Sequence, residues 1–190
     1  MALALATRDK LSAAGTTRIA AALAKHGLRR QSVPGLRPLT AFQDLLVGEA
    51  CKTIDTCPPG GVLVVEGSAT SVPVALLVRR RAAGVVSDGP LRNAAEIARA
   101  SLPAYHRPPS PAAKPLQIET GDIILGDRNG VLVVPAALAD QVAEEAAEAA
   151  AYEEFVAERV DAGGGVYGLH IPSGEHARRA FAAWRRLRGR

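Results

Sequence analysis

The sequence predicts an α/β fold, and three observations lead to this prediction. Short β-branched runs alternate with helical segments over residues 45–106. A strand–helix–strand rhythm of this kind is typical of parallel crossover units. A Gly-Asp-Arg-Asn-Gly turn then joins two apolar runs, which indicates a β-hairpin. From Pro135 onward good helix formers dominate, so the chain should end in long helices.

The N-terminal part reads as two short helices separated at Gly15. Thr16 or Thr17 is suited to cap the second helix, because a hydroxyl can accept a hydrogen bond from a free helix amide. Gly27 is suited to end it, because glycine readily adopts the left-handed conformation. The segment 32–39 has two prolines within five residues and is expected to be an extended loop.

The remaining elements follow from hydrophobic periodicity. Strands are expected at 45–54, 62–67, 83–89 and 102–106, with helices between them at 72–84 and 91–101. The hairpin strands are expected at 122–125 and 130–134. The whole chain, 1–190, is expected to be one domain in which 136–190 forms a helical C-terminal extension.

Composition limits the class of protein. The chain has 190 residues, of which 48% are apolar and only 4% aromatic, so one core of Ala, Val, Leu and Ile is expected. The formal net charge is +4, and much of the excess lies in the last fifteen residues. A nucleic-acid-binding protein would show a denser basic face with interleaved aromatic residues. Nucleic acid is therefore not expected as a partner.

The two cysteines are Cys51 and Cys57. Their spacing fits neither a redox CxxC pair nor half of a zinc site. No disulfide framework is expected from so few cysteines, which suits a reducing compartment. The first ten residues lack the features of a signal peptide, and no apolar segment approaches the roughly 20 residues that cross a bilayer. A cytoplasmic protein with no membrane contact is expected.

Several segments together resemble the RraA-like family. They are "GVVSDGPLRNAAEI", "LPAY", "GDIILGDRNGVLVVPAALADQVAEEA" and "EEFVAERVDAGGGVYGLHIPS". This family contains the metal-dependent 4-hydroxy-4-methyl-2-oxoglutarate aldolases and the regulator of ribonuclease E activity. The resemblance implies a single-domain β/β/α sandwich with long C-terminal helices. It also implies a homotrimer or homohexamer with sites at the subunit interfaces.

The resemblance further implies a site around the Asp-Gly turn at 88–89. Asp88 and Gly89 match the family's turn, and Arg92 matches the arginine that binds the carboxylate and enolate oxygens of a pyruvate unit. Asn93 occupies the position of the aspartate that holds Mg²⁺ or Mn²⁺, and Glu96 matches the acid that supports the metal's water shell. An amide oxygen carries no charge, so metal affinity should be weaker than in catalytic relatives.

Other residues are weaker candidates. Ser71 and Val72 match the loop that receives the substrate carboxylate, but the next residue is Pro73, which has no amide N–H to donate. His106 ends an expected strand and could transfer a proton. The remaining candidates are Glu49, which suits structural pairing equally well, and His170 and His176, which form no pair with metal-ligand spacing.

Three functions are compatible with these features. Retro-aldol cleavage or decarboxylation of a 2-oxo acid places negative charge on the 2-oxo oxygen, which a guanidinium and a divalent cation stabilise. The first expectation is therefore a divergent aldolase-like carbon–carbon lyase that acts on a small 2-oxo acid. One alternative is a metal-independent hydratase, isomerase or cyclase that uses the same pocket, and another is a non-catalytic regulator that binds a protein. The turn at 88–90 could also be purely structural, with Arg92 a solvated helix residue.

Overall fold

The computed structural model describes residues 3–29, 31–40, 45–66, 74–92, 94–108, 116–165 and 174–189. The chain divides into two compact units, Met1–Ala146 and Ala147–Arg190. The division falls inside helix α4 (Ala139–Asp161), so the first part of the expected C-terminal extension belongs to the first unit.

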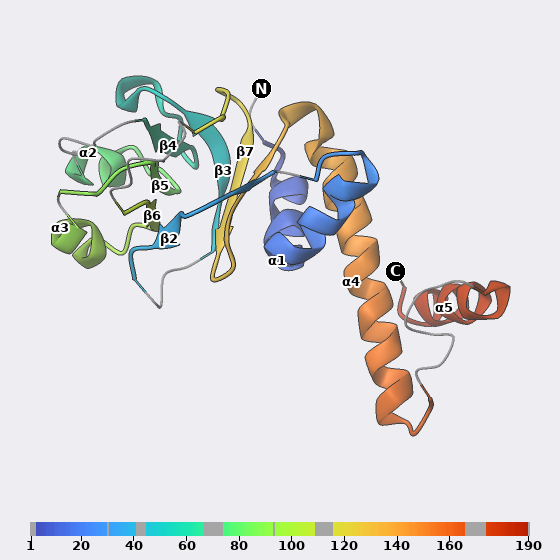
Figure 1. The fold of residues 1–190 in the computed structure, drawn as a ribbon. Coiled ribbons are helices and arrows are strands. Elements are labelled where there is room, and N and C mark those ends of the chain that lie inside the picture. The colour runs from blue at the N-terminus through green and yellow to red at the C-terminus, as the bar shows by residue number, and fades with distance from the viewer. Residues whose placement is uncertain are drawn as a thin grey trace. The chain divides into compact units, whose positions relative to one another are not determined.

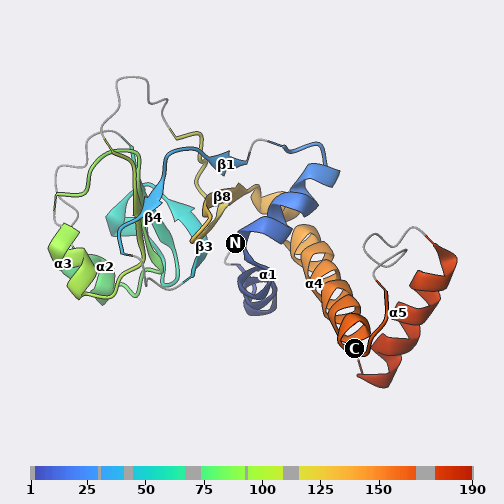
Figure 2. The same cartoon turned by 60° about the horizontal axis from the view of Figure 1, so that its bottom comes forward.

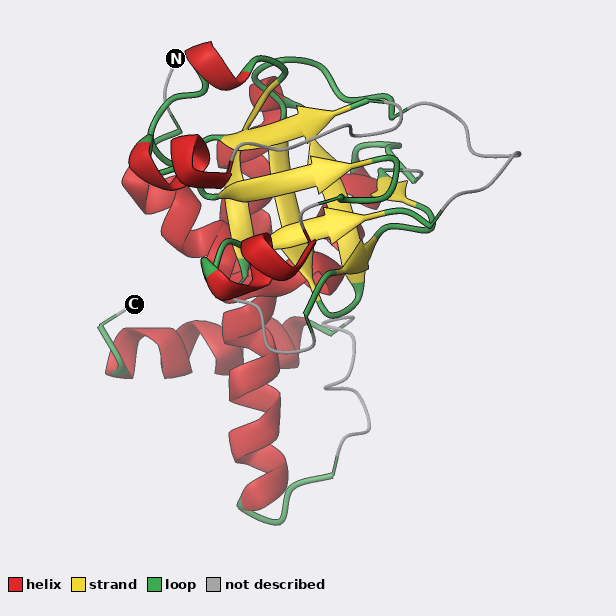
Figure 3. Ribbon diagram, turned by 90° about the vertical axis from the view of Figure 1, so that its left-hand side faces the viewer, coloured by secondary structure: helices red, strands yellow, loops and turns green. Residues whose placement is uncertain are grey.

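The first unit is built on a sheet with helices packed against it (Figure 3). The described strands of this sheet follow the order β1-β8-β7-β3-β4-β5-β6-β2. The strands are β1 (Ser32–Val33), β2 (Arg37–Pro38), β3 (Leu46–Cys51), β4 (Val62–Val65), β5 (Gly84–Ser87), β6 (Ala104–His106), β7 (Ile123–Asp127) and β8 (Gly130–Val134). Strands β3 to β6 are parallel to one another, and the other pairs are antiparallel. The expected alternation of strands and helices is thus confirmed.

Three apolar clusters divide the first unit into layers. One cluster lies between the parallel and antiparallel halves of the sheet and includes Val64, Val86 and Ile124. A second lies under α2 (Val74–Arg79) and α3 (Ala94–Arg99), which cover the outer face of the parallel half (Figures 1 and 2). The third packs α1 (Leu5–Lys25) and the start of α4 against the antiparallel half. This layering explains why aliphatic residues suffice for the core.

Helix α1 contains the expected break. Gly15 has φ +71° and ψ 167°, so the helix stops and restarts at Thr16. The restart is fixed by Asp127, whose Oδ2 accepts hydrogen bonds from the Thr16 amide at 3.0 Å and its hydroxyl at 2.8 Å. A carboxylate thus satisfies one of the free amides of the new helix from across the fold. Gly27, with φ +79°, lies just beyond the helix end as expected.

The β7–β8 hairpin also matches the expectation. Asp127 pairs with Gly130 in the register, so the turn contains two residues. Gly126 is required for packing, because a Cβ there would lie 2.5 Å from the ring of Tyr105. The Tyr105 hydroxyl donates to the carbonyl oxygen of Asp127 at 3.1 Å. This hydrogen bond ties the hairpin to the parallel half of the sheet.

Two expectations need correction. The segment 32–39 is not entirely loop, because β1 and β2 each place two of its residues in the sheet. The prolines allow this at the sheet's two edges, where a missing N–H costs no ladder hydrogen bond.

The cysteines are not free thiols: Cys51 and Cys57 form a disulfide whose Cα atoms are 5.4 Å apart. Both lie buried in the cluster under α2 and α3, where the chain returns on itself between β3 and β4.

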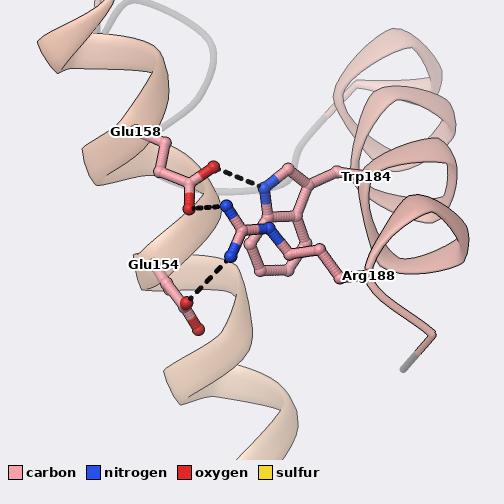
Figure 4. A network of polar contacts seen from close by, with 4 residues as sticks. All are labelled: Glu154, Glu158, Trp184 and Arg188. Atoms are coloured by element: carbon pink, nitrogen blue, oxygen red, sulfur yellow. Dashed lines mark hydrogen bonds and ion pairs between the residues drawn. The ribbon is translucent and has the colours of Figure 1, made fainter.

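The second unit contains the remainder of α4 and helix α5 (Glu175–Leu187). Phe155 is fully buried and contacts the rings of Tyr152, Phe181 and Trp184 at centroid distances between 5.6 and 5.9 Å. The indole Nε1 of Trp184 donates to Glu158 at 2.7 Å. Figure 4 draws one network of polar contacts in this unit, in which Arg188 also pairs with Glu158 and Glu154.

None of the helices in the described segments has both the length and the apolar character needed to cross a membrane.

Candidate active site at the carboxyl ends of the parallel strands

The parallel half of the sheet brings several predicted site residues to one edge. Val65, Ser87 and His106 are register partners on β4, β5 and β6. The residues that follow them, Glu66 and Asp88 among them, therefore emerge at the same edge. The carboxyl ends of parallel strands are where α/β proteins bind ligands, because the loops there are free to vary.

The Asp-Gly turn at the end of β5 is tightly held. The amide of Asp88 donates to the Val65 carbonyl at 3.1 Å. The hydroxyl of Ser87 accepts from the Gly89 amide at 3.3 Å and donates to the Gly89 carbonyl at 3.0 Å. Leu91 is 7% exposed and belongs to the cluster under the helices. The turn is consequently anchored on both sides of its glycine.

The predicted anion-binding residue, Arg92, is exposed to solvent. It lies between the anchored turn and α3, which begins at Ala94 rather than at Arg92. Glu96 lies in the first turn of α3 and is also exposed. In the single chain, both side chains thus border open solvent rather than an enclosed pocket.

His106 is half-buried at the end of β6. Because side chains alternate along a strand, His106 and Ser87 lie on the face covered by α2 and α3. The His106 Nδ1 is buried and accepts or donates no hydrogen bond within the described parts of the chain. A buried ring nitrogen without a described partner is uncommon and fits a group that meets a ligand.

The sequence reasoning missed an ion pair at the same edge. Lys52 follows β3, and its Nζ lies 2.8 Å from Oε1 of Glu66, which follows β4. The hydrogen bond to Glu66 raises the pKa of Lys52 above 10.5, although partial desolvation acts in the opposite direction and Glu119 adds a smaller increase. Both side chains are about two-fifths exposed, at 41% and 43%. Their pairing depends on β3 and β4 being neighbours in the sheet, which the sequence does not report.

Arg107 was also missed. Its side chain is only 8% exposed, and its backbone amide donates to the Ser87 carbonyl at 3.2 Å. Its backbone therefore continues this edge beyond β5, while its side chain lies beside Gly35, where an added Cβ would be 3.6 Å from it. The sequence feature that could have identified Arg107 is its position directly after His106.

The other candidates are distributed differently. Ser71, Val72, Pro73, Asn93 and His170 lie outside the described residues. Glu49 is half-buried on β3, opposite Ile123 of β7. His176 is exposed on α5 and belongs to the second unit.

Side chains that could bind a divalent cation are dispersed among the described residues. Within the described ranges, no three His, Cys, Asp or Glu residues come together as a metal cluster. Glu66 is engaged by Lys52, and Glu96 is exposed on α3. Mg²⁺ and Mn²⁺ require several oxygen ligands in a compact arrangement, and Asn93, the residue that the resemblance assigns to the metal, lies outside the described residues.

Comparisons with known proteins agree with this architecture. The family model "RraA-like: Aldolase/RraA" matches residues 16–133, which is more than half of the chain. A search of curated proteins finds no significant match.

Three solved structures share the fold. An uncharacterized protein from Pseudomonas syringae pv. tomato str. DC3000 has a TM-score of 0.74 at 20% identity, covering 90% of this chain and 100% of that one. Streptomyces coelicolor RraAS2, described as an unusual member of the RNase ES inhibitor RraA protein family, has a TM-score of 0.68 at 22% identity, covering 82% and 97%. A structure described among novel cellulases from gut-associated microbes has a TM-score of 0.66 at 20% identity, covering 78% and 85%.

The sequence resemblance and the expected β/β/α architecture are thereby confirmed. This chain belongs to the RraA-like family.

Proposed function

We propose that this protein is a carbon–carbon lyase that acts on a small 2-oxo acid at the carboxyl edge of strands β4 to β6. One observation supports this more than any other. The register of the three strands brings the anchored Asp88–Gly89 turn beside His106, whose Nδ1 is buried without a described partner. The turn leads directly to Arg92.

In the proposed reaction, the Arg92 guanidinium binds the substrate carboxylate and the developing enolate oxygen. A planar, permanently charged fork suits both groups. With a 4-hydroxy-2-oxo acid, His106 accepts the proton of the substrate hydroxyl as the carbon–carbon bond breaks; with oxaloacetate, the bond breaks as the carboxylate leaves as CO₂ and no such proton is transferred. The bonding electrons pass into the 2-oxo group to form pyruvate enolate, which takes up a proton at carbon to give pyruvate. Asp88 orients the imidazole or the substrate from the neighbouring strand end.

The proposal includes two features that the family implies. The first is a homotrimer or homohexamer, because a neighbouring copy could enclose Arg92, which is exposed in the single chain. The second is a weak Mg²⁺ or Mn²⁺ requirement, since Asn93 supplies a neutral oxygen where relatives supply a carboxylate. The same pocket could instead serve a metal-independent reaction on a related acid, and the experiment below separates the two.

Pyruvate release is the direct test. Purified protein is supplied with 4-hydroxy-4-methyl-2-oxoglutarate or oxaloacetate, in chelator and in a titration of Mn²⁺, and pyruvate is followed by a coupled dehydrogenase. Arg92→Ala should lower kcat/KM by about 100-fold or more. Arg99→Ala is the matched control, because Arg99 is an exposed arginine in the last turn of α3, the short helix that follows Arg92.

The Asn93→Asp variant tests whether the reaction requires a divalent cation. Asn93→Asp restores a charged ligand and should increase both Mn²⁺ affinity and pyruvate release. If the wild-type protein releases pyruvate in chelator and Asn93→Asp does not increase that release, the metal-independent alternative is favoured. No pyruvate from either substrate, with wild type and Asn93→Asp alike, would overturn the lyase proposal.

A further inference from the structure

We infer that Ser87 is a positioning residue whose hydroxyl fixes the Asp88–Gly89 turn and thereby holds Arg92 in place for anion binding. Only the last step of this inference, anion binding by Arg92, rests on the proposed function. Ser87 is completely buried and is one of few buried polar residues among those described. A buried hydroxyl requires hydrogen-bond partners, because transfer of a polar group from water is unfavourable unless the group is hydrogen-bonded.

The hydroxyl satisfies both backbone groups of one residue. It accepts from the Gly89 amide at 3.3 Å and donates to the Gly89 carbonyl at 3.0 Å. Gly89 is itself buried, so water cannot easily replace these bonds. Removing the hydroxyl would leave a buried donor and a buried acceptor unsatisfied, which favours a rearrangement of the turn.

Two other described contacts hold the turn. The Asp88 amide is held by the Val65 carbonyl, and the next fixed point is the buried side chain of Leu91. Between them, Gly89 has no side chain to pack, and Pro90 is exposed. The chain from β5 to Arg92 therefore passes through a glycine whose amide and carbonyl are both bound by the Ser87 hydroxyl.

The test compares Ser87→Thr with Ser87→Val. Both variants place a β-branched side chain of nearly the same size at the buried position, and Ser87→Val has a second methyl group where Ser87→Thr keeps the hydroxyl, so the comparison isolates the hydroxyl at nearly constant volume. The probe is oxalate, a planar dianion that resembles pyruvate enolate, and its Kd is measured by calorimetry in chelator. Amide hydrogen exchange at Gly89 is measured on the same samples.

The Ser87→Thr protein should bind oxalate with a Kd close to that of wild type. The Ser87→Val protein should bind oxalate about tenfold more weakly. Exchange at Gly89 should be faster in Ser87→Val than in Ser87→Thr, and Ser87→Val should also have the lower thermal unfolding midpoint. If the wild-type protein binds oxalate and Ser87→Thr and Ser87→Val have equal Kd values, the positioning role is overturned and the proposed function is left intact. A wild-type protein that does not bind oxalate would overturn the proposed anion site together with this role.

Discussion

The two units of the chain are stabilised in different ways. The first unit has aliphatic clusters on both sides of a sheet, and every strand is secured by ladder hydrogen bonds. The second is a pair of helices joined by one aromatic cluster and by ion pairs between acidic residues of α4 and arginines of α5. The family match lies entirely in the first unit. A proposed site on the first unit should therefore tolerate changes that unfold the second.

The largest expected effect is that of Phe155→Ala. Truncation of a fully buried ring should destabilise the helix pair by about 3–5 kcal/mol. The chain has a single tryptophan, Trp184, so its fluorescence reports on the second unit alone. The emission maximum should shift toward that of exposed indole, with Phe155→Leu as the milder control.

Hydrogen exchange then sharpens the comparison between the units. In Phe155→Ala, peptides from β3 to β8 should keep their wild-type protection. If those peptides lose protection together with α5, the two units unfold as one cooperative body and the distinction drawn here is wrong.

A smaller effect is expected from Asp127→Ala in the first unit. The Asp127 carboxylate accepts from the Thr16 amide and hydroxyl and from the Asn129 amide. Loss of these bonds should destabilise the first unit by about 1–3 kcal/mol. Urea denaturation followed by far-ultraviolet circular dichroism measures this. Asp122→Ala is the control, because Asp122 accepts one amide at an exposed turn, and Trp184 emission should not change in the native state.

A change below 1 kcal/mol is expected for Glu158→Gln. Glu158 accepts from the Trp184 indole and pairs with Arg188 in an exposed position. Exposed ion pairs contribute little and are screened by salt. The fluorescence-detected unfolding midpoint should differ from wild type at low ionic strength, and the difference should shrink in 1 M salt. An effect that is independent of salt would show that the indole hydrogen bond, rather than the charge, matters.

The smallest effect on stability is expected at the Lys52–Glu66 pair. Because the hydrogen bond from Lys52 to Glu66 raises the pKa of Lys52, Glu66→Gln should lower that pKa toward 10.5. The raised value means that the pair contributes at neutral pH and that its contribution disappears as the pH rises above 10.5. A titration of the lysine side-chain carbon by NMR measures the shift. An unchanged pKa would show that the pair does not persist in solution.

Much of the first unit was predictable because its signals are local. The Gly15 break, the end at Gly27 and the two-residue hairpin turn each depend on residues adjacent in sequence. The two-residue strands β1 and β2 were missed because they depend on long-range pairing with β8 and β6, which local patterning does not reveal. The disulfide was missed for a related reason, since the spacing of two cysteines does not report whether the chain turns back between them.

The site was predictable only in part. The turn at Asp88 and the strand end at His106 follow from local pattern and from the family resemblance. The pairing of Lys52 with Glu66 could not be read from sequence, because it depends on which strands are neighbours in the sheet. The aromatic cluster of the second unit was likewise hidden, because its rings come from two separate helices.

The disulfide has a practical consequence for biophysical work. The chain has two cysteines, and both sulfurs are used in one buried bond. A cysteine introduced at an exposed position, such as Leu187 at 89% exposure, would be the sole reactive group for maleimide chemistry. Spin labels or donor–acceptor dyes could thus be attached at chosen places without first replacing the native residues.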